Sequence, residues 1–244
     1  MEIIEIDKTS EILKGAHYIG HGTTAICFKN KNNRVIKLYR NTNNKRYLFE
    51  RNMYEHLNLL NEITNESFLG PEIIITSHGQ IIGYIYPFKK AKTLARISPL
   101  INAETLIKPT EKLIKNTDQI SNHQFMLKDL HDKNMLFKEE FTVIDLDQGE
   151  KSLYSKDSIR YANRTKVLKN IMNSLFHIKE YQIMYIHSSE TQKLYNQMLY
   201  EDYRKMREFF KSLKEDLNKQ ELKISDLRRN RLITKEYNSY YRPF

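Results

Sequence analysis

The sequence is short of the residues that build disulfides, membrane spans and flexible turns. Its 244 residues include one cysteine, no tryptophan, seven glycines and five prolines. The single Cys27 excludes an intrachain disulfide and indicates a reducing compartment, so we expect a cytoplasmic protein. The acidic N-terminal segment lacks a sustained apolar core, which argues against a secretory signal. No apolar run approaches the length of a membrane span, so no membrane partner is expected.

Basic residues outnumber acidic ones, and the excess lies in the C-terminal part. Lys and Arg total 40 against 30 Asp and Glu, which gives a formal net charge of +10. Residues 1–150 are nearly balanced at 20 to 19, whereas residues 151–244 carry 20 to 11. This charge attracts nucleotides, acidic proteins or nucleic acids alike. The length suffices for one two-lobed domain, or two small ones, with a substantial core.

Because glycine is scarce, the closely spaced pair Gly20 and Gly22 is informative. The pattern over residues 18–28 predicts a strand, a glycine turn and a second strand. Such a backbone suits the close approach of phosphate oxygens, with a plain hairpin as the alternative. The next predicted strand, residues 34–39, carries Lys37 among apolar neighbours. Lys37 therefore either snorkels at a strand edge or has a buried partner.

A partner for Lys37 is available on the next element. Residues 45–60 have helical periodicity, and Glu50 adjoins their apolar side, with Glu55 as the second candidate. A further hairpin is predicted over residues 72–86.

The stretch from residue 126 to 147 sets polar side chains between short apolar runs. Residues 135–137 and 141–144 predict a β-hairpin. With its turn centred on residues 139–140, Asn134 lies opposite Asp145.

Three side chains around this hairpin have chemistry suited to a site. Asn134 and Asp145 offer the hard oxygen ligands that Mg²⁺ prefers, and Asp129, on the preceding loop, could accept a proton from a hydroxyl. A surface hairpin flanked by solvated acids is the alternative.

The other segments are predicted to be helical. A helix over residues 102–120 should begin, kink or divide at Pro109. Residues 159–178 predict an amphipathic helix with Asn163 and Arg164 exposed.

From Ser189 onward, a heptad-like apolar pattern predicts one helix of about thirty residues, with Ser188 or Ser189 as its cap. Residues 189–220 either pack onto the C-terminal part or bind a partner helix or a second copy. The tail, residues 226–242, mixes arginine with tyrosine. It is either a charged helix end held by aromatic packing or a surface on which nucleic-acid bases stack.

Two segments together resemble a known family. Asp129-Leu130-His131-Asp132-Lys133-Asn134 is similar to the catalytic loop of the protein-kinase-like superfamily, and Asp145-Leu146-Asp147 resembles its D-F-G metal segment. The D-L-H-x-x-N form is nearest to aminoglycoside kinases, choline kinases and other atypical branches. The departures are Ala25 for the third loop glycine, Leu127 for the usual His, His131 for a Lys and Asp147 for the D-F-G glycine.

The resemblance covers about residues 15–180 and implies an α+β, bilobal kinase-like fold. An N-terminal lobe, residues 1–86, would hold a five-stranded antiparallel sheet and one helix. A reduced helical C-terminal lobe, residues 87–244, would carry the catalytic hairpin.

It also implies a Mg²⁺-dependent phosphotransferase that moves the γ-phosphate of ATP to a hydroxyl group. The implied site comprises the catalytic residues Asp129, Lys37 and Glu50, the nucleotide-binding residues Gly20, Gly22, Thr23, Lys37, Tyr86, Phe88 and His131, and the magnesium ligands Asn134 and Asp145.

The expected acceptor is a protein Ser or Thr, because a pocket for polycationic drugs would favour acidic walls and this chain is basic. A small-molecule kinase and a pseudokinase that binds nucleotide without transfer are the alternatives.

Overall fold

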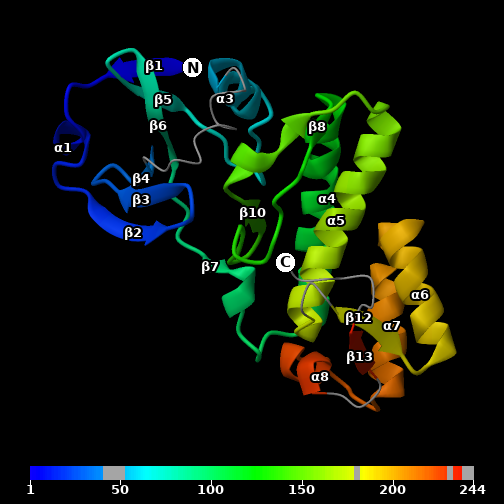
Figure 1. The fold of residues 1–244 in the computed structure, drawn as a ribbon. Coiled ribbons are helices and arrows are strands. Elements are labelled where there is room, and N and C mark those ends of the chain that lie inside the picture. The colour runs from blue at the N-terminus through cyan, green and yellow to red at the C-terminus, as the bar shows by residue number, and fades with distance from the viewer. Residues whose placement is uncertain (41–52, 179–181, 230–232, 238–244) are drawn as a thin grey trace. The chain divides into compact units, whose positions relative to one another are not determined.

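A computed structural model describes residues 1–40, 53–178, 182–229 and 233–237 (Figure 1). Helices and strands are mixed along the chain, which confirms the α+β class. The chain forms two compact units, Met1–Lys90 with Ile144–Glu150, and Ala91–Val143 with Lys151–Phe244. A short segment from the middle of the sequence therefore belongs with the N-terminal unit.

The first unit is built on a sheet of six strands in the order β1-β5-β6-β4-β3-β2. Their bounds are β1 Glu2–Glu5, β2 His17–His21, β3 Ala25–Lys29, β4 Arg34–Tyr39, β5 Ile73–Ser77 and β6 Gln80–Pro87. β1 runs parallel to β5, and the other neighbours are antiparallel. The expected five-stranded antiparallel sheet is therefore wrong, because β1 adds a sixth, parallel edge strand. Three of its four residues are exposed, so its apolar pattern is weak.

One face of this sheet carries the core of the first unit. Ile36, Ile75 and Ile85 are buried together, and Ile12 of the short helix α1, Thr9–Ile12, packs against them. The longer helix α3, Met53–Glu62, buries Leu57 and Leu60. The predicted helix over residues 45–60 begins in a segment, residues 41–52, that lies outside the described residues.

The hairpin predicted over residues 72–86 is confirmed as β5 and β6. His78 and Gly79 connect the strands, and both have positive φ, 51° and 71°. Two left-handed residues make a turn whose twist matches that of the flanking strands, and glycine adopts this conformation without steric cost.

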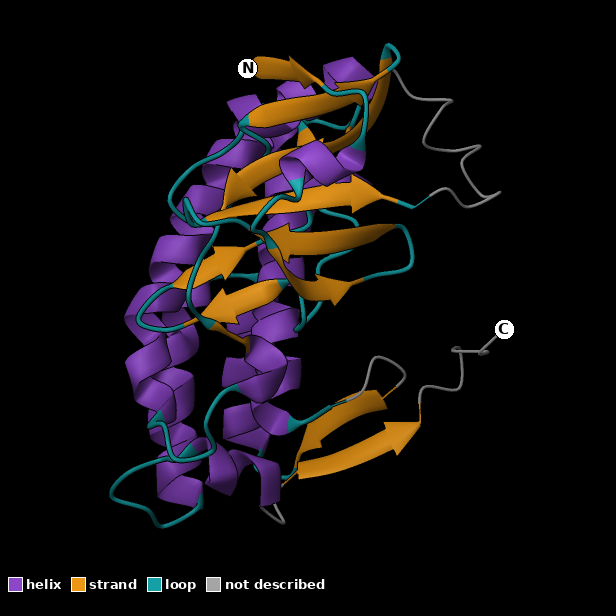
Figure 2. Ribbon diagram, turned by 90° about the vertical axis from the view of Figure 1, so that its left-hand side faces the viewer, coloured by secondary structure: helices purple, strands orange, loops and turns teal. Residues whose placement is uncertain are grey.

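The second unit is mainly helical (Figure 2). Its long helices, α4 Ile107–Asn122 and α5 Lys156–Phe176, lie side by side. The other elements are β7 Lys92–Thr93, η1 Leu94–Arg96, η2 Ala103–Leu106, β8 Phe125–Met126, β9 Met135–Phe137, β10 Phe141–Val143, β12 Gln182–Ile186, α6 Ser189–Tyr200, η4 Tyr203–Lys205, α7 Met206–Asp216, α8 Ile224–Arg229 and β13 Ile233–Tyr237. β11, Glu150–Lys151, lies at the boundary of the two units, and η3, Leu146–Gln148, belongs to the first.

A helix begins at Ile107, two residues before Pro109, which is one of the outcomes predicted for this proline. Pro109 lies in the first turn of α4, where a backbone N–H has no intrahelical acceptor and its loss costs little.

The predicted hairpin after the 129–134 loop forms, but its register differs. Met135 pairs with Val143 and Phe137 with Phe141, so the turn is centred on Glu139 alone. A three-residue turn in place of the expected even one shifts the pairing by one residue. The prediction that Asn134 lies opposite Asp145 in the ladder is therefore wrong.

The single long helix predicted from Ser189 is also wrong. Ser188, one of the two expected caps, accepts a hydrogen bond from the Thr191 amide and caps α6. This helix ends at Tyr200, and Asp202, whose side chain accepts from the Arg204 amide, caps the separate helix η4. Asp offers the backbone such local bonds and disfavours continuation of a helix. The apolar positions Leu199, Met206, Phe210 and Leu213 are buried within the unit, which leaves them no surface for a partner helix.

Asn163 was expected on the exposed side of its helix, and the structure buries it at 1% exposure. Its side chain donates to Phe125 O and Ser121 Oγ and accepts from the Leu127 amide. A buried amide with three partners costs little, because it satisfies backbone groups that burial would otherwise strand.

No helix among the described residues is long and apolar enough to cross a membrane. In the tail, the described residues form α8 and β13, and β13 pairs with β12.

Gly83 tests how tightly the first sheet is packed. A Cβ at Gly83 would lie 2.1 Å from the Lys37 backbone oxygen, whereas one at Gly20 would meet open space. We expect Gly83→Ala to lower the free energy of unfolding by about 1–3 kcal/mol through overpacking. Gly20→Ala is the control, with a change within about 0.5 kcal/mol. Urea titration followed by circular dichroism measures both variants. Equal free energies of unfolding for the two variants would contradict the close approach of Gly83 on β6 to the Lys37 backbone on β4.

Candidate functional site

Strand register in the first unit sets a row of functional side chains across the sheet. Lys37 on β4 pairs with Cys27 on β3 and with Tyr84 on β6. Residues that pair directly share a face, opposite to the face that carries Ile36. Lys37 is only 4% exposed, so its ammonium requires partners. Of the two alternatives for Lys37, a strand-edge position or a buried partner, the structure shows the second.

The partners come from the segment Ile144–Glu150. Lys37 Nζ donates to Asp145 Oδ1, and to Asp147 Oδ2 at 2.7 Å. Asp145 has φ 62° and ψ 55°, the left-handed conformation that Asp tolerates better than most residues. Asp145 is the N-cap residue of the short helix η3, which carries Asp147.

Asp147 is the buried centre of this group, which we call the Lys37 cluster: Lys37, Tyr39, Tyr84, Asp145 and Asp147. The Tyr84 hydroxyl donates to Asp147 Oδ1 at 2.5 Å, and the Tyr39 hydroxyl lies 3.4 Å from Oδ2. The side chain of Asp147 is 7% exposed, against 43% for Asp145. Asp147 is thus the structural anion and Asp145 the solvent-facing one.

Charges in the cluster support one another. Burial alone would lower the pKa of Lys37, but the charges of Asp147 and Asp145 outweigh it and raise that pKa. Burial alone would raise the pKa of Asp147, but the charge of Lys37, with hydrogen bonds from Lys37 and Tyr84, lowers it. Burial, then the charge of Asp147, raises the pKa of Tyr84 and of Tyr39, so both stay neutral donors.

The predicted partner of Lys37, Glu50, lies outside the described residues. Glu55, the second candidate, is exposed on α3. Sequence patterns did not indicate Asp147 as a partner, although an acid two residues from Asp145 was the available signal. On the same helix His56 Nε2 donates to the Asp147 backbone oxygen at 2.9 Å.

The predicted turn is present between β2 and β3, but of the two glycines only Gly22 lies in it, because Gly20 belongs to β2 and pairs with Cys27. The Gly22 amide donates to Ala25 O at 2.9 Å, and Thr23 is exposed in the turn. A Cβ at Gly20 or Gly22 would have nothing within 4 Å, and neither residue has positive φ. Packing among the described residues therefore does not require glycine at either position.

The nucleotide-binding residues predicted at Tyr86 and Phe88 already make contacts within the first unit. Tyr86 is buried at 8% exposure. The Phe88 amide donates to Asn33 O at 3.0 Å, and Lys29 Nζ lies 4.4 Å from its ring centroid. The Phe88 amide therefore has an acceptor already and would have to exchange it to bind a base.

In the second unit, the 129–134 loop closes on itself. Asn134 Nδ2 donates to Asp129 O at 3.0 Å, and the Asn134 amide donates to His131 O at 3.0 Å. His131 Nε2 lies 3.8 Å from Asp129 Oδ1, and both side chains are about half exposed. Asp129, His131 and Asn134 are thus brought together, with the Asp129 carboxylate open to solvent.

Helix α5 anchors this loop. Asn163 accepts from the Leu127 amide, and Lys166 Nζ donates to the Leu127 oxygen at 3.1 Å and to the Lys128 oxygen. A polar stripe at helical spacing, Asn163, Lys166, Asn170, Asn173 and His177, was the sequence signal for this role, and the apolar pattern of the same helix obscured it.

The two magnesium ligands predicted from the sequence fall in different units, Asn134 in the second and Asp145 in the first. The described residues contain no group of three His, Cys, Asp or Glu side chains that could hold a metal ion.

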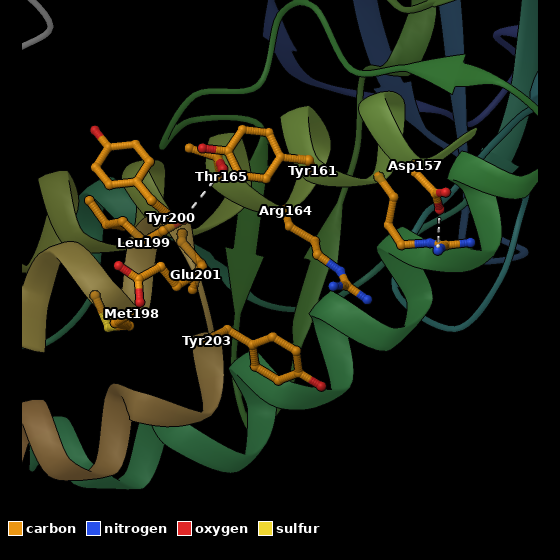
Figure 3. Close-up of a pocket in the computed structure, with 11 residues that line it drawn as sticks. Asp157, Tyr161, Arg164, Thr165, Met198, Leu199, Tyr200, Glu201 and Tyr203 are labelled. Atoms are coloured by element: carbon orange, nitrogen blue, oxygen red, sulfur yellow. Dashed lines mark hydrogen bonds and ion pairs between the residues drawn. The ribbon is translucent and has the colours of Figure 1, made fainter. Parts of the chain in front are cut away.

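One cavity of the second unit, about 240 Å³, lies between α5 and the end of α6. Figure 3 shows Tyr161, Tyr200 and Tyr203 around it, with Arg164 between them. Arg164 makes a bidentate pair with Asp118, 2.6 and 2.5 Å, which raises the pKa of its guanidinium. Its charge is therefore already compensated.

Comparison with known proteins gives a distant similarity and no family. No family model matches the chain. The chain is 30% identical over 211 residues to Protein PFC0760c of Plasmodium falciparum, which covers 86% of this chain. The chain spans only 6% of the length of that protein.

Removing the charge of Lys37 alone should destabilise the first unit more than removing the charges of both Lys37 and Asp147. Lys37→Met leaves the buried Asp147 carboxylate uncompensated, which costs about 3–5 kcal/mol. Lys37→Met/Asp147→Leu removes both charges and should recover part of that loss. Lys29→Met, on the neighbouring strand, is the control, at about 1 kcal/mol or less. Denaturant titration gives the three values, and a double variant less stable than Lys37→Met would contradict the arrangement.

Acid should remove the contribution of Asp147. Because its folded pKa lies below the unfolded value of about 3.9, this carboxylate stabilises the fold fully above that value, and the contribution is lost as pH falls through the folded pKa. Unfolding free energies from neutral pH to about pH 3 should therefore fall more steeply for the natural protein than for Lys37→Met/Asp147→Leu. Parallel profiles would show that Asp147 titrates normally.

Proposed function

We propose that the chain is a kinase-like phosphotransferase of bilobal form, which moves the γ-phosphate of ATP to a hydroxyl group. Support comes from the contact between Lys37 and Asp145, which are 108 positions apart in the sequence. These are the two residues that the resemblance assigns to phosphate contact and metal binding. Two unrelated surface residues would have no reason to meet on the buried face of a sheet.

The residues present fit a nucleotide. The Lys37 ammonium has three N–H donors. Among the described residues, the carboxylates of Asp145 and Asp147 accept from two of them, so the third can donate to a phosphate oxygen. Gly20 and Gly22 leave open space that their own unit does not use. A backbone without side chains there can approach phosphate oxygens closely.

The residue types that the resemblance assigns to Mg²⁺ also suit that ion. The first unit offers the half-exposed carboxylate of Asp145 and the second unit offers the amide oxygen of Asn134, and both are hard oxygen ligands. When bound, Mg²⁺ would neutralise phosphate charge. Among the described residues, Asp147 fixes the Lys37 ammonium, which is the orienting role that the resemblance assigns to Glu50.

Asp129 serves as the proton acceptor. The acceptor oxygen bonds to the γ-phosphorus while the bond from that phosphorus to the β,γ-bridging oxygen breaks, and the hydroxyl proton passes to the Asp129 carboxylate. The products are ADP and a phosphate ester. The exposure of Asp129 and its position beside His131 leave it accessible to a hydroxyl.

A nucleotide-binding pseudokinase is the second candidate. The observation that favours it is the buried Asp147, which compensates Lys37 where the D-F-G segment of the family has glycine. A lysine held by two carboxylates attracts phosphate more weakly than one held by a single glutamate.

Transfer from γ-labelled ATP separates the two candidates. We expect label on a mixed protein substrate or on a small alcohol, and Asp129→Asn should slow it by about 10²–10⁴-fold while ATP binding persists. Asp145→Asn should abolish Mg²⁺-dependent transfer. The matched control is Glu139→Gln, whose side chain is 85% exposed in the hairpin turn, and circular dichroism checks each fold. Mg²⁺-dependent ATP binding without transfer would establish the pseudokinase, and no ATP binding would refute both.

A further inference from the structure

The second unit contains a larger cavity beside the 129–134 loop. Its volume is about 820 Å³, within the range of small-molecule sites. Its walls come from the loop, from the C-terminal half of α5 and from α8. The residues that matter here are Lys128, Asp129, Lys166, Lys169, Ser174 and Arg228.

Positive charge dominates these walls. Lys128, Lys166, Lys169 and Arg228 face two carboxylates, those of Asp129 and Asp132, and His131 and His177 also line the cavity. The acids both belong to the loop. Arg228 lies on α8, with Ser174 beside it on α5, so the excess charge is greatest away from the loop.

Two buried polar atoms here lack hydrogen-bond partners among the described residues, Ser174 Oγ and Arg228 Nε. Ser174 is 8% exposed. Arg228 Nη2 donates to the Ser174 backbone oxygen at 3.4 Å, which holds the Arg228 side chain beside the backbone of Ser174. Both orphaned atoms can donate, so what is missing is an acceptor. Leaving such donors buried is costly, and native proteins rarely do so.

The surroundings strengthen the preference for an anion. Burial lowers the pKa of the Arg228 guanidinium, and burial, followed by the charge of Arg228, lowers the pKa of Lys235. Lys235 donates to the His177 oxygen at 3.3 Å, so a second cation lies close by. A phosphate or carboxylate beside Arg228, which lines the cavity, would compensate the charge of its guanidinium and accept hydrogen bonds from it.

We propose that this cavity binds a small molecule that carries a phosphate or carboxylate group, with Arg228 and Ser174 holding the anion. Asp129 lines the same cavity, so the molecule also carries the hydroxyl that accepts the phosphoryl group. This second statement rests on the proposed function, whereas the anion site does not. The reaction then converts an anionic alcohol and ATP into its phosphate ester and ADP, with the hydroxyl proton passing to Asp129.

Calorimetry on the full chain, without ATP, tests the anion site. The probes are inorganic phosphate, glycerol 3-phosphate, glycerate and neutral glycerol. We expect a phosphate or carboxylate probe to bind and glycerol not to bind. Arg228→Gln should weaken binding by about 10- to 100-fold, and Ser174→Ala by less. Arg229→Gln is the matched control, because Arg229 is the exposed neighbour on the same helix and does not line the cavity. Thermal unfolding shows whether each variant is folded.

The probes separate the sources of the anion, since binding of glycerol 3-phosphate alone identifies phosphate and binding of glycerate alone identifies carboxylate. Absence of binding by every anionic probe at millimolar concentration, or equal loss in Arg228→Gln and Arg229→Gln, would overturn the site. A bound probe that ATP never phosphorylates leaves the anion site standing and refutes its role as acceptor. Asp129-dependent transfer to an acidic serine peptide, with no small probe bound, would refute the small molecule and leave the phosphotransferase standing.

Discussion

The buried ion pair between Lys37 and Asp147 is the constraint on which the first unit depends. Neither charge could be placed at that depth alone, because the loss of solvation would exceed what any single contact returns. The pair therefore requires the segment Ile144–Glu150 to fold with strands that precede it by more than a hundred positions. Tyr84 and Tyr39 stabilise the pair further, since Asp147 accepts hydrogen bonds from their hydroxyl groups.

In the second unit, hydrogen bonds from side chains to backbone groups fix the 129–134 loop. The 129–134 loop must carry an exposed carboxylate and still keep one shape. It does so through backbone bonds made by Asn134 from within and by Asn163 and Lys166 from α5. Buried amide side chains of this kind confer a fixed geometry with little penalty of desolvation. The backbone groups of Leu127 make the polar contacts with α5, whereas its side chain is buried.

Local patterns predicted the strands β4 and β9 to the residue, the β5–β6 hairpin and the capping role of Ser188, because short-range chemistry determines these features. Features that depend on tertiary contacts were not predictable in the same way. The edge strand β1 has too few apolar residues to reveal itself, the break at Asp202 depends on a cap that overrides an apolar repeat, and Asn163 is buried by what surrounds it. In the candidate site, Lys37 and its need for a partner were evident, but its choice of Asp147 was decided by long-range packing.

Helix α5 has a consequence of its own. Asn163 and Lys166 of this helix bind the backbone that leads into the 129–134 loop, and Lys166 also lines the cavity together with Ser174 and His177 at the C-terminal end of the helix. A helix transmits displacement along its axis far better than a loop does. An anion held at Arg228 and Ser174, as proposed, would restrict this helix and with it the segment that leads to Asp129, so that binding in the cavity and ordering of the loop would be linked.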